Sequence, residues 1–309
     1  MVWVLPLGLC GAILAALTVP ELGVLLHGWG LVPGLVALIF LISGLQTRAG
    51  TLQLEPRFVR TLLSAALISL LLSPLLGWLL ARYGGLGPDL ALGLLVMALA
   101  PPTLSSCVVL TGAAGGKSLW ALFMTLGLNL LGIFSIPLLL TLLVGDATGF
   151  SPWALLGKLL TIVLLPFLCG LLLRPMLRGW SRRGWLNLVP TLCVVLTVWM
   201  TLSHSRALLL QLSLAQLAGI GALAVLLHLT LMGVSLLAAR GLRLEREEGY
   251  ALLFTASQKT LPVAVSVLVG LGAPTGVAVI SCILFHFGQL MLDSTLVVPL
   301  RRRLQRVAV

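Results

Sequence analysis

Long apolar stretches dominate the sequence and alternate with short polar or basic segments. Ten of them reach or approach the roughly 20 residues that a helix needs to cross a bilayer. A transmembrane β-barrel is excluded, because its strands would alternate apolar and polar residues. The pattern therefore predicts an all-α polytopic membrane protein with ten transmembrane helices. The expected helices cover residues 3–20, 31–45, 59–81, 90–112, 118–143, 154–174, 186–203, 214–239, 249–271 and 276–300.

The composition supports this prediction. Of the 309 residues, 60% are hydrophobic and only 9% are charged, which excludes a soluble domain and a disordered chain. The net charge of +11 would suit nucleic acid, but lysine and arginine excess also orients membrane helices, so the expected partner is the lipid bilayer. The five cysteines lie inside apolar stretches without metal-ligand spacing, so we expect neither a metal nor another cofactor.

The basic residues predict the orientation of the chain. If the ten helices alternate in direction, fifteen of the 19 lysines and arginines fall on one side and three on the other. The cytoplasmic side carries the positive excess, so both termini are expected there. The three on the opposite side are Arg82, Lys158 and Arg206; Lys259 lies inside a helix.

Ten helices divide into two sets of five, and an odd number inverts the second set relative to the first. The sequence thus predicts one membrane domain, residues 1–309, built from inverted repeats 1–145 and 150–309, as in many secondary transporters. The fourth expected helix of each repeat contains a break: Pro101-Pro102 in the first, and the polar run ahead of Pro262 in the second.

Lys259 is the most informative polar residue, because it lies about 15 Å from either end of its expected helix. An unpaired charge at that depth costs at least about 2.5–3.5 kcal/mol, which indicates a functional site or a structural ion pair. Asp293 is the acidic residue deep in an expected helix, at a similar depth, so the two could pair. His286, Gln289 and Asp293 share one helix face, which we expect to point into the protein.

Other polar side chains complete the candidate site. Thr125 and Asn129 share a helix face, where the asparagine either binds a ligand or links two helices. His286 is as readily a core histidine as a functional one, and His228 is interpreted as structural. The candidate substrate- or ion-binding residues are Pro101, Pro102, Thr103, Ser105, Ser106, Thr125, Asn129, Gln258, Lys259, Thr260, His286 and Asp293.

The segments 100–106 and 254–260, with support from His286, resemble the bile acid:sodium symporter superfamily, and its divergent bacterial SBF-like branch in particular. The resemblance spans the chain and implies broken helices 4 and 9 that cross near the midplane of a bacterial inner membrane. It also implies a core of helices 3–5 and 8–10, a panel of helices 1, 2, 6 and 7, and a substrate held between them.

The resemblance also maps sodium-site positions onto this chain. Hydroxyl and amide ligands of typical members fall on Ser105, Ser106, Thr125 and Asn129, and a glutamine on helix 3 falls on Ser69. Their helix 9 motif keeps Gln258, but Phe254 replaces a glutamate and Lys259 replaces an asparagine. Sodium prefers oxygen ligands, so we expect coupling to two sodium ions to be lost here. The Lys259 ammonium would then act as a built-in cation, or release a proton when substrate binds.

These observations favour a secondary transporter of a small organic anion that works by alternating access, with a proton or sodium as the possible coupling ion. The alternatives are a sodium-coupled symporter of the usual bile acid type and a non-transporting membrane scaffold or sensor. An enzyme is not expected, because only Asp293 among the acids lies deep in a helix and no catalytic motif occurs.

Overall fold

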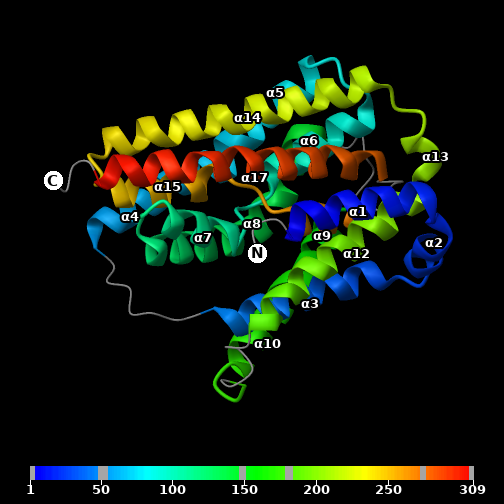
Figure 1. Cartoon of the computed structure of the whole chain (residues 1–309), viewed down its shortest axis with the longest axis horizontal. Helices are drawn as coiled ribbons and strands as arrows, with labels where there is room; N and C mark the ends of the chain where they lie inside the picture. The colour runs from blue at the N-terminus through cyan, green and yellow to red at the C-terminus, as the bar shows by residue number, and fades with distance from the viewer. Residues whose placement is uncertain (1–3, 48–54, 146–150, 178–183, 272–275, 306–309) are drawn as a thin grey trace.

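The computed structural model describes residues 4–47, 55–145, 151–177, 184–271 and 276–305, which form helices joined by short connections, with no strand in these ranges (Figure 1). In chain order the elements are α1 (Val4–Thr18), α2 (Pro20–Gly28), α3 (Leu31–Gln46), α4 (Pro56–Ala66), η1 (Leu67–Leu72), α5 (Ser73–Tyr83), α6 (Pro88–Leu99), α7 (Ser106–Ala113), α8 (Ser118–Val144), α9 (Pro152–Leu159), η3 (Leu160–Leu164), α10 (Leu165–Leu173), η4 (Gly184–Asn187), α12 (Leu188–His204), α13 (Arg206–Leu209), α14 (Leu214–Gly241), α15 (Arg246–Ser257), α16 (Leu261–Leu271) and α17 (Gly276–Gln305).

The all-α polytopic class is confirmed. Six helical segments among the described residues are long and apolar enough to cross a membrane, and α3, α6 and α12 are shorter apolar helices. One segment departs from the prediction: residues 21–28, expected as part of a connection, belong to the helix α2 (Pro20–Gly28). This helix is bent by 98° from α1, and Pro20 stands at its start, where a proline needs no N–H partner.

The helices pack into two bundles, which Figure 1 shows side by side. The small bundle contains α1, α2, α3, α9, α10 and α12, with α1 packed on α12 and α3 packed on α10. The large bundle contains α4 to α8 and α14 to α17, with α5 packed on α6, α14 on α15, and α17 on both α6 and α14.

Glycines permit close approach within both bundles. A Cβ atom on Gly44 of α3 would collide with the carbonyl oxygen of Phe167, and one on Gly170 of α10 with that of Leu41. In the large bundle, a Cβ on Gly93 of α6 would collide with the carbonyl oxygen of Ala278 on α17. Small residues at such crossings let helix backbones touch in an apolar environment, where van der Waals packing drives association.

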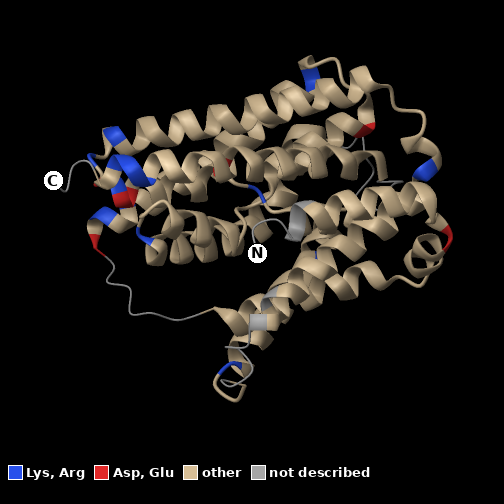
Figure 2. Cartoon of the chain, viewed as in Figure 1, with Lys and Arg blue, Asp and Glu red and all other residues tan. Residues whose placement is uncertain are grey.

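Charged residues gather at the helix ends and leave the middle of the molecule nearly free of them (Figure 2). One such cluster ties the start of α15 to its neighbours: Lys117 Nζ donates to Glu248 Oε1 at 2.8 Å, and Arg57 lies 3.2 Å from Glu245. The hydrogen bond to the Glu248 carboxylate raises the pKa of Lys117. This end of the large bundle is therefore held by charge pairs, whereas the middle is held by apolar packing.

Candidate functional site

The two predicted breaks are present and lie against each other. Helix α6 ends at Leu99, directly before Ala100 and the two prolines, and α7 starts only at Ser106. Helix α15 ends at Ser257, and α16 starts at Leu261. The backbone N–H of Thr260 donates to the carbonyl oxygen of Pro101 at 2.9 Å, so the second break is hydrogen-bonded directly to the first.

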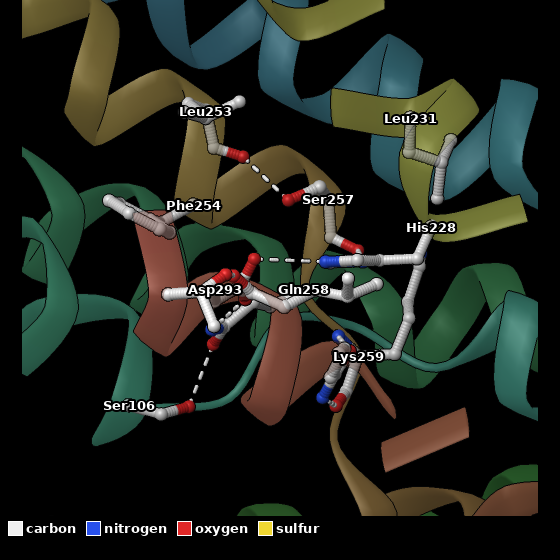
Figure 3. A network of polar contacts seen from close by, with 12 residues as sticks. Ser106, His228, Leu231, Leu253, Phe254, Ser257, Gln258, Lys259 and Asp293 are labelled. Carbon is white, nitrogen blue, oxygen red and sulfur yellow. Dashed lines mark hydrogen bonds and ion pairs between the residues drawn. The ribbon is translucent and has the colours of Figure 1, made fainter. Parts of the chain in front are cut away.

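Gln258 connects the surroundings of both breaks (Figure 3). Its side chain is fully buried, and its Oε1 accepts from Thr103 Oγ1 and Ser106 Oγ, each at 2.7 Å. The Cys107 thiol adds a third contact to the same oxygen at 3.1 Å. On the other side, Gln258 Nε2 donates to Asp293 Oδ2 at 2.6 Å. The amide thereby joins the first break to α17.

The expected pairing of Lys259 with Asp293 is wrong. Asp293 Oδ1 lies 2.9 Å from Nε2 of His228, and none of the ion pairs among the described residues involves Lys259. His228 was interpreted as a structural residue on its own, but it belongs to this polar network. Its Nδ1 lies 3.3 Å from the carbonyl oxygen of Ser257, at the end of α15.

Lys259 instead contacts the π-helical turn η1. Its Nζ donates to the carbonyl oxygen of Ser69 at 2.6 Å and to Ser69 Oγ at 3.1 Å. In a π-helix each N–H bonds five residues back, as Ser73 does to Ile68. In that register the Ser69 carbonyl would need an N–H from Pro74, and proline has none. The lysine supplies the donor that this carbonyl lacks.

The polar stripe on α17 points into the protein, as predicted, where it faces the second break. Gln289 makes two hydrogen bonds to the backbone of Lys259: its Oε1 accepts from the N–H at 2.9 Å, and its Nε2 donates to the carbonyl oxygen at 2.7 Å. His286 Nδ1 lies 2.9 Å from the same Gln289 nitrogen. These contacts satisfy backbone groups that the interrupted helix leaves free.

Asn129 of α8 stabilises the first break. Its Nδ2 donates to the carbonyl oxygen of Pro102 at 2.9 Å and to that of Thr125 at 2.8 Å. The Thr125 hydroxyl, buried nearby, has no hydrogen-bond partner among the described residues.

A cavity of about 110 Å³ lies between the two bundles beside the breaks. Six of the twelve candidate residues line it: Thr103, Ser105, Ser106, Asn129, Thr260 and His286. The small bundle contributes Ile39, Phe40, Ser43, Pro190, Thr191 and Val194 to the opposite wall. Lys259 and Asp293 do not line the cavity, so a substrate in the cavity would not contact either side chain directly.

Several residues of this region were missed by the sequence analysis. The small-bundle wall was not foreseen, because an apolar residue such as Phe40 that faces a cavity has the same sequence pattern as one that faces lipid. Cys107 was interpreted as a small buried apolar residue, yet its thiol contacts Gln258. Its position directly after Ser105 and Ser106, in the candidate motif, was the available signal. Within the described residues, no group of three histidine, cysteine or acidic side chains is placed to hold a metal.

Two broken helices joined beside a cavity with a partly polar lining are typical of secondary transporters. The sequence profile of the SBF-like CPA transporter family matches residues 4–302, and the chain belongs to that family. The family is one of transporters and not of enzymes, so the predicted family and the absence of enzymatic function are both confirmed.

Named relatives are similar over much of the chain. The probable sodium/metabolite cotransporter BASS4 of Arabidopsis thaliana is 32% identical over 95% of this chain and 71% of its own length. The putative symporter YfeH of Escherichia coli is 26% identical over 76% of this chain and 74% of its own length. Sodium/bile acid cotransporter 7-A of Xenopus laevis is 31% identical over 48% of this chain and 44% of its own length.

Proposed function

We propose that this protein is a secondary transporter of a small organic anion, a carboxylate or a sulfonate, that works by alternating access. The observation that carries the proposal is the convergence of two helix N-termini on one cavity. Ser105 and Ser106 at the start of α7, and Thr260 and Pro262 at the start of α16, line that cavity. The N-terminus of a helix carries a partial positive charge and free N–H groups, which favour an anion.

The packing supports the inverted repeat. In the predicted order of ten spans, α1 is span 1, α3 is span 2, α10 belongs to span 6 and α12 is span 7. If spans 1–5 correspond to spans 6–10, the contact of α1 with α12 corresponds to the contact of α10 with α3. Likewise the contact of α5 with α6 corresponds to that of α14 with α15. On this proposal the small bundle is the panel and the large bundle is the core, and transport is a rocking of one against the other.

The charge of the substrate is tested at Ser105, which lines the cavity and stands at the N-cap of α7. Aspartate and asparagine are both good N-cap residues, so Ser105→Asp and Ser105→Asn differ mainly in charge. We expect Ser105→Asp to lower anion exchange at least about tenfold relative to Ser105→Asn, because two like charges a few ångströms apart repel by several kcal/mol. The measurement is counterflow in proteoliposomes with a panel of labelled carboxylates, sulfonates and uncharged analogues. Exchange of the uncharged analogues alone, or equal rates for both variants, would contradict an anionic substrate.

The proposed topology places ten spans in the inner membrane of a bacterium, with both termini in the cytoplasm. The asymmetry of basic residues supports it. Reporter fusions after Arg183 and after Val309 should give the same cytoplasmic signal, and a fusion after Ala273 should give the opposite one. A different pattern would show that a span has been miscounted.

We also propose that sodium does not drive transport. Gln258 Oε1 already accepts hydrogen bonds, both Asp293 oxygens are bonded, and the residue that follows Gln258 is the buried Lys259. Phe254, at the position where the resemblance implies a carboxylate, is fully buried in an apolar cluster with Leu110 and Met232. A sodium ion here would displace existing donors and meet a positive charge.

Replacement of choline chloride by sodium chloride at 100 mM should therefore leave the melting temperature unchanged. An ion that binds with a dissociation constant of about 1 mM would add about 2.7 kcal/mol at that concentration. Such a gain raises the melting temperature by several degrees. A clear sodium-dependent shift would favour the alternative, a sodium-coupled symporter.

A further inference from the structure

His228 and Asp293 form a buried pair that no part of the proposed substrate site uses directly. The two side chains are 1% and 0% exposed, and they come from α14 and α17, which pack side by side (Figures 1 and 3). His228 Nε2 lies 2.9 Å from Asp293 Oδ1, and Nδ1 lies 3.3 Å from the carbonyl oxygen of Ser257. Each ring nitrogen thus faces an oxygen.

This arrangement favours one additional proton. A carbonyl oxygen only accepts hydrogen bonds, so Nδ1 must carry a hydrogen to bond Ser257. If Nδ1 carries it, the contact between Nε2 and Asp293 requires another proton, held either by the imidazole or by the carboxyl group. Without that proton, one ring nitrogen presents a lone pair to an oxygen, and one of the two hydrogen bonds is lost. Histidine is also the side chain that ordinarily exchanges a proton between about pH 5 and 8.

The pair is connected to the substrate cavity. Asp293 Oδ2 accepts from Gln258 Nε2, and Gln258 Oε1 accepts from the hydroxyls of Thr103 and Ser106, which line the cavity. A substrate that competes for those hydroxyls changes the polarisation of the Gln258 amide, and with it the hydrogen bond to Asp293. Substrate and proton therefore influence each other through a single side chain in the break.

Few other ionisable groups face the pair. Lys259 contributes a positive charge from the break, His286 an imidazole from α17, and Cys107 a thiol from α7 that contacts Gln258. The remaining charged residues of the elements packed against α14 and α17 lie near helix ends. They are Arg57 and Arg60 on α4, Arg82 on α5, Asp89 on α6, Arg206 on α13, Arg240 on α14, Arg246, Glu247 and Glu248 on α15, and Arg301, Arg302 and Arg303 on α17, with the titratable His204 at the end of α12.

We propose that His228 and Asp293 form the proton-binding site of this protein, which binds one proton and communicates its occupancy to the cavity through Gln258. The proton is held as the Nε2–H of His228, which donates to Asp293; it comes from water and returns to water, and only N–H and O–H bonds form or break. In identifying the proton as the coupling ion, this proposal rests on the proposed transport function. The proton site itself stands on the geometry of the pair.

The test is a pH titration of the full-length protein in lipid nanodiscs, with ¹⁵N-labelled histidine observed by NMR. The chain has four histidines, and His228→Gln assigns the resonances of interest. We expect the His228 resonances to change from those of a neutral imidazole to those of an imidazolium as the pH is lowered. In Asp293→Asn the midpoint should fall by at least about one pH unit, a tenfold loss of proton affinity, because the anion that stabilises the imidazolium is gone.

Gln258→Leu should move the midpoint the opposite way, because it removes a hydrogen bond that stabilises the ionised carboxylate. Since Asp293→Asn could fail to fold, the titrations of the wild type and of Gln258→Leu are sufficient to test the proposed proton site. His204→Gln, on α12 in the small bundle, is the control and should leave the His228 midpoint unchanged. A His228 that keeps one protonation state over the whole range, or ignores Gln258→Leu, would overturn the proposal. Equal exchange by Ser105→Asp and Ser105→Asn, or exchange of the uncharged analogues alone, would remove the anion-transport role and leave this titration intact.

Discussion

Replacement of Lys259 by alanine is expected to abolish anion exchange. The side chain is fully buried and links the second break to η1 through two hydrogen bonds to Ser69. Its loss leaves the Ser69 carbonyl without a donor, because Pro74 cannot provide one. An unsatisfied buried group of this kind costs about 1–3 kcal/mol, and the vacated volume adds a packing defect. The measurements are counterflow in proteoliposomes at matched protein content and the melting temperature of the purified protein.

Two further substitutions separate the charge of Lys259 from its volume. Lys259→Met keeps an unbranched side chain of similar length and restores most of the packing, but it removes the ammonium. Lys259→Arg keeps the positive charge but replaces a compact ammonium with a planar fork, which does not fit the same space. We expect both variants to lose exchange, with Lys259→Met melting closer to the wild type than Lys259→Ala does. Exchange by Lys259→Met at the wild-type rate would show that the ammonium has no role.

Deletion of the backbone hydrogen bond between the two breaks is expected to have the second largest effect. Thr260→Pro removes the N–H that donates to Pro101, whereas Thr260→Ala keeps it. Both variants lose the same hydroxyl, so the comparison reports the loss of the backbone donor together with the constraint that the proline ring places on the backbone. Thr260→Pro should eliminate exchange and lower the melting temperature by several degrees, because a buried carbonyl is left unpaired and the breaks separate.

Thr260→Ala should retain most of the exchange activity and melt near the wild type. The comparison requires circular dichroism of both variants, which should show equal helix content. If Thr260→Pro transports and melts like Thr260→Ala, the bond between the breaks does not hold the site together.

The sequence predicted the elements of the fold well, because apolar length and paired prolines are local signals. All ten apolar stretches coincide with described helices, and both breaks occur where prolines and polar residues interrupt them. The bend between α1 and α2 was not predicted, since a short apolar segment after a proline can continue or turn. Local sequence signals also do not predict which helices pack against each other in the two bundles.

Many of the candidate residues lie together beside the two breaks, but the sequence did not predict which contacts each one makes. Their positions along the expected helices predict that Lys259 and Asp293 lie at similar depths in the membrane. These positions do not predict the direction in which each side chain points. Lys259 extends toward η1 and Asp293 toward α14, so their partners are Ser69 and His228. The acceptor role of Ser69 arises from the π-helical register ahead of Pro74. The sequence shows the proline but not the register.

The hydrogen bond from Lys158 Nζ on α9 to the carbonyl oxygen of Gly270 on α16, at 2.9 Å, fastens the small bundle to the large one at one end. Two residues of the cavity wall, Ser43 and Thr191, lie near the end of α3 and the start of α12, respectively. If transport proceeds by alternating access as we propose, the Lys158 contact holds the two bundles together on the outer side of the membrane. In the orientation we propose, a polar inhibitor that cannot cross the membrane should compete with the substrate when it is added on the cytoplasmic side. The same inhibitor should have no effect when it is added outside. Exposure of the outer entrance requires that the Lys158 contact be released first.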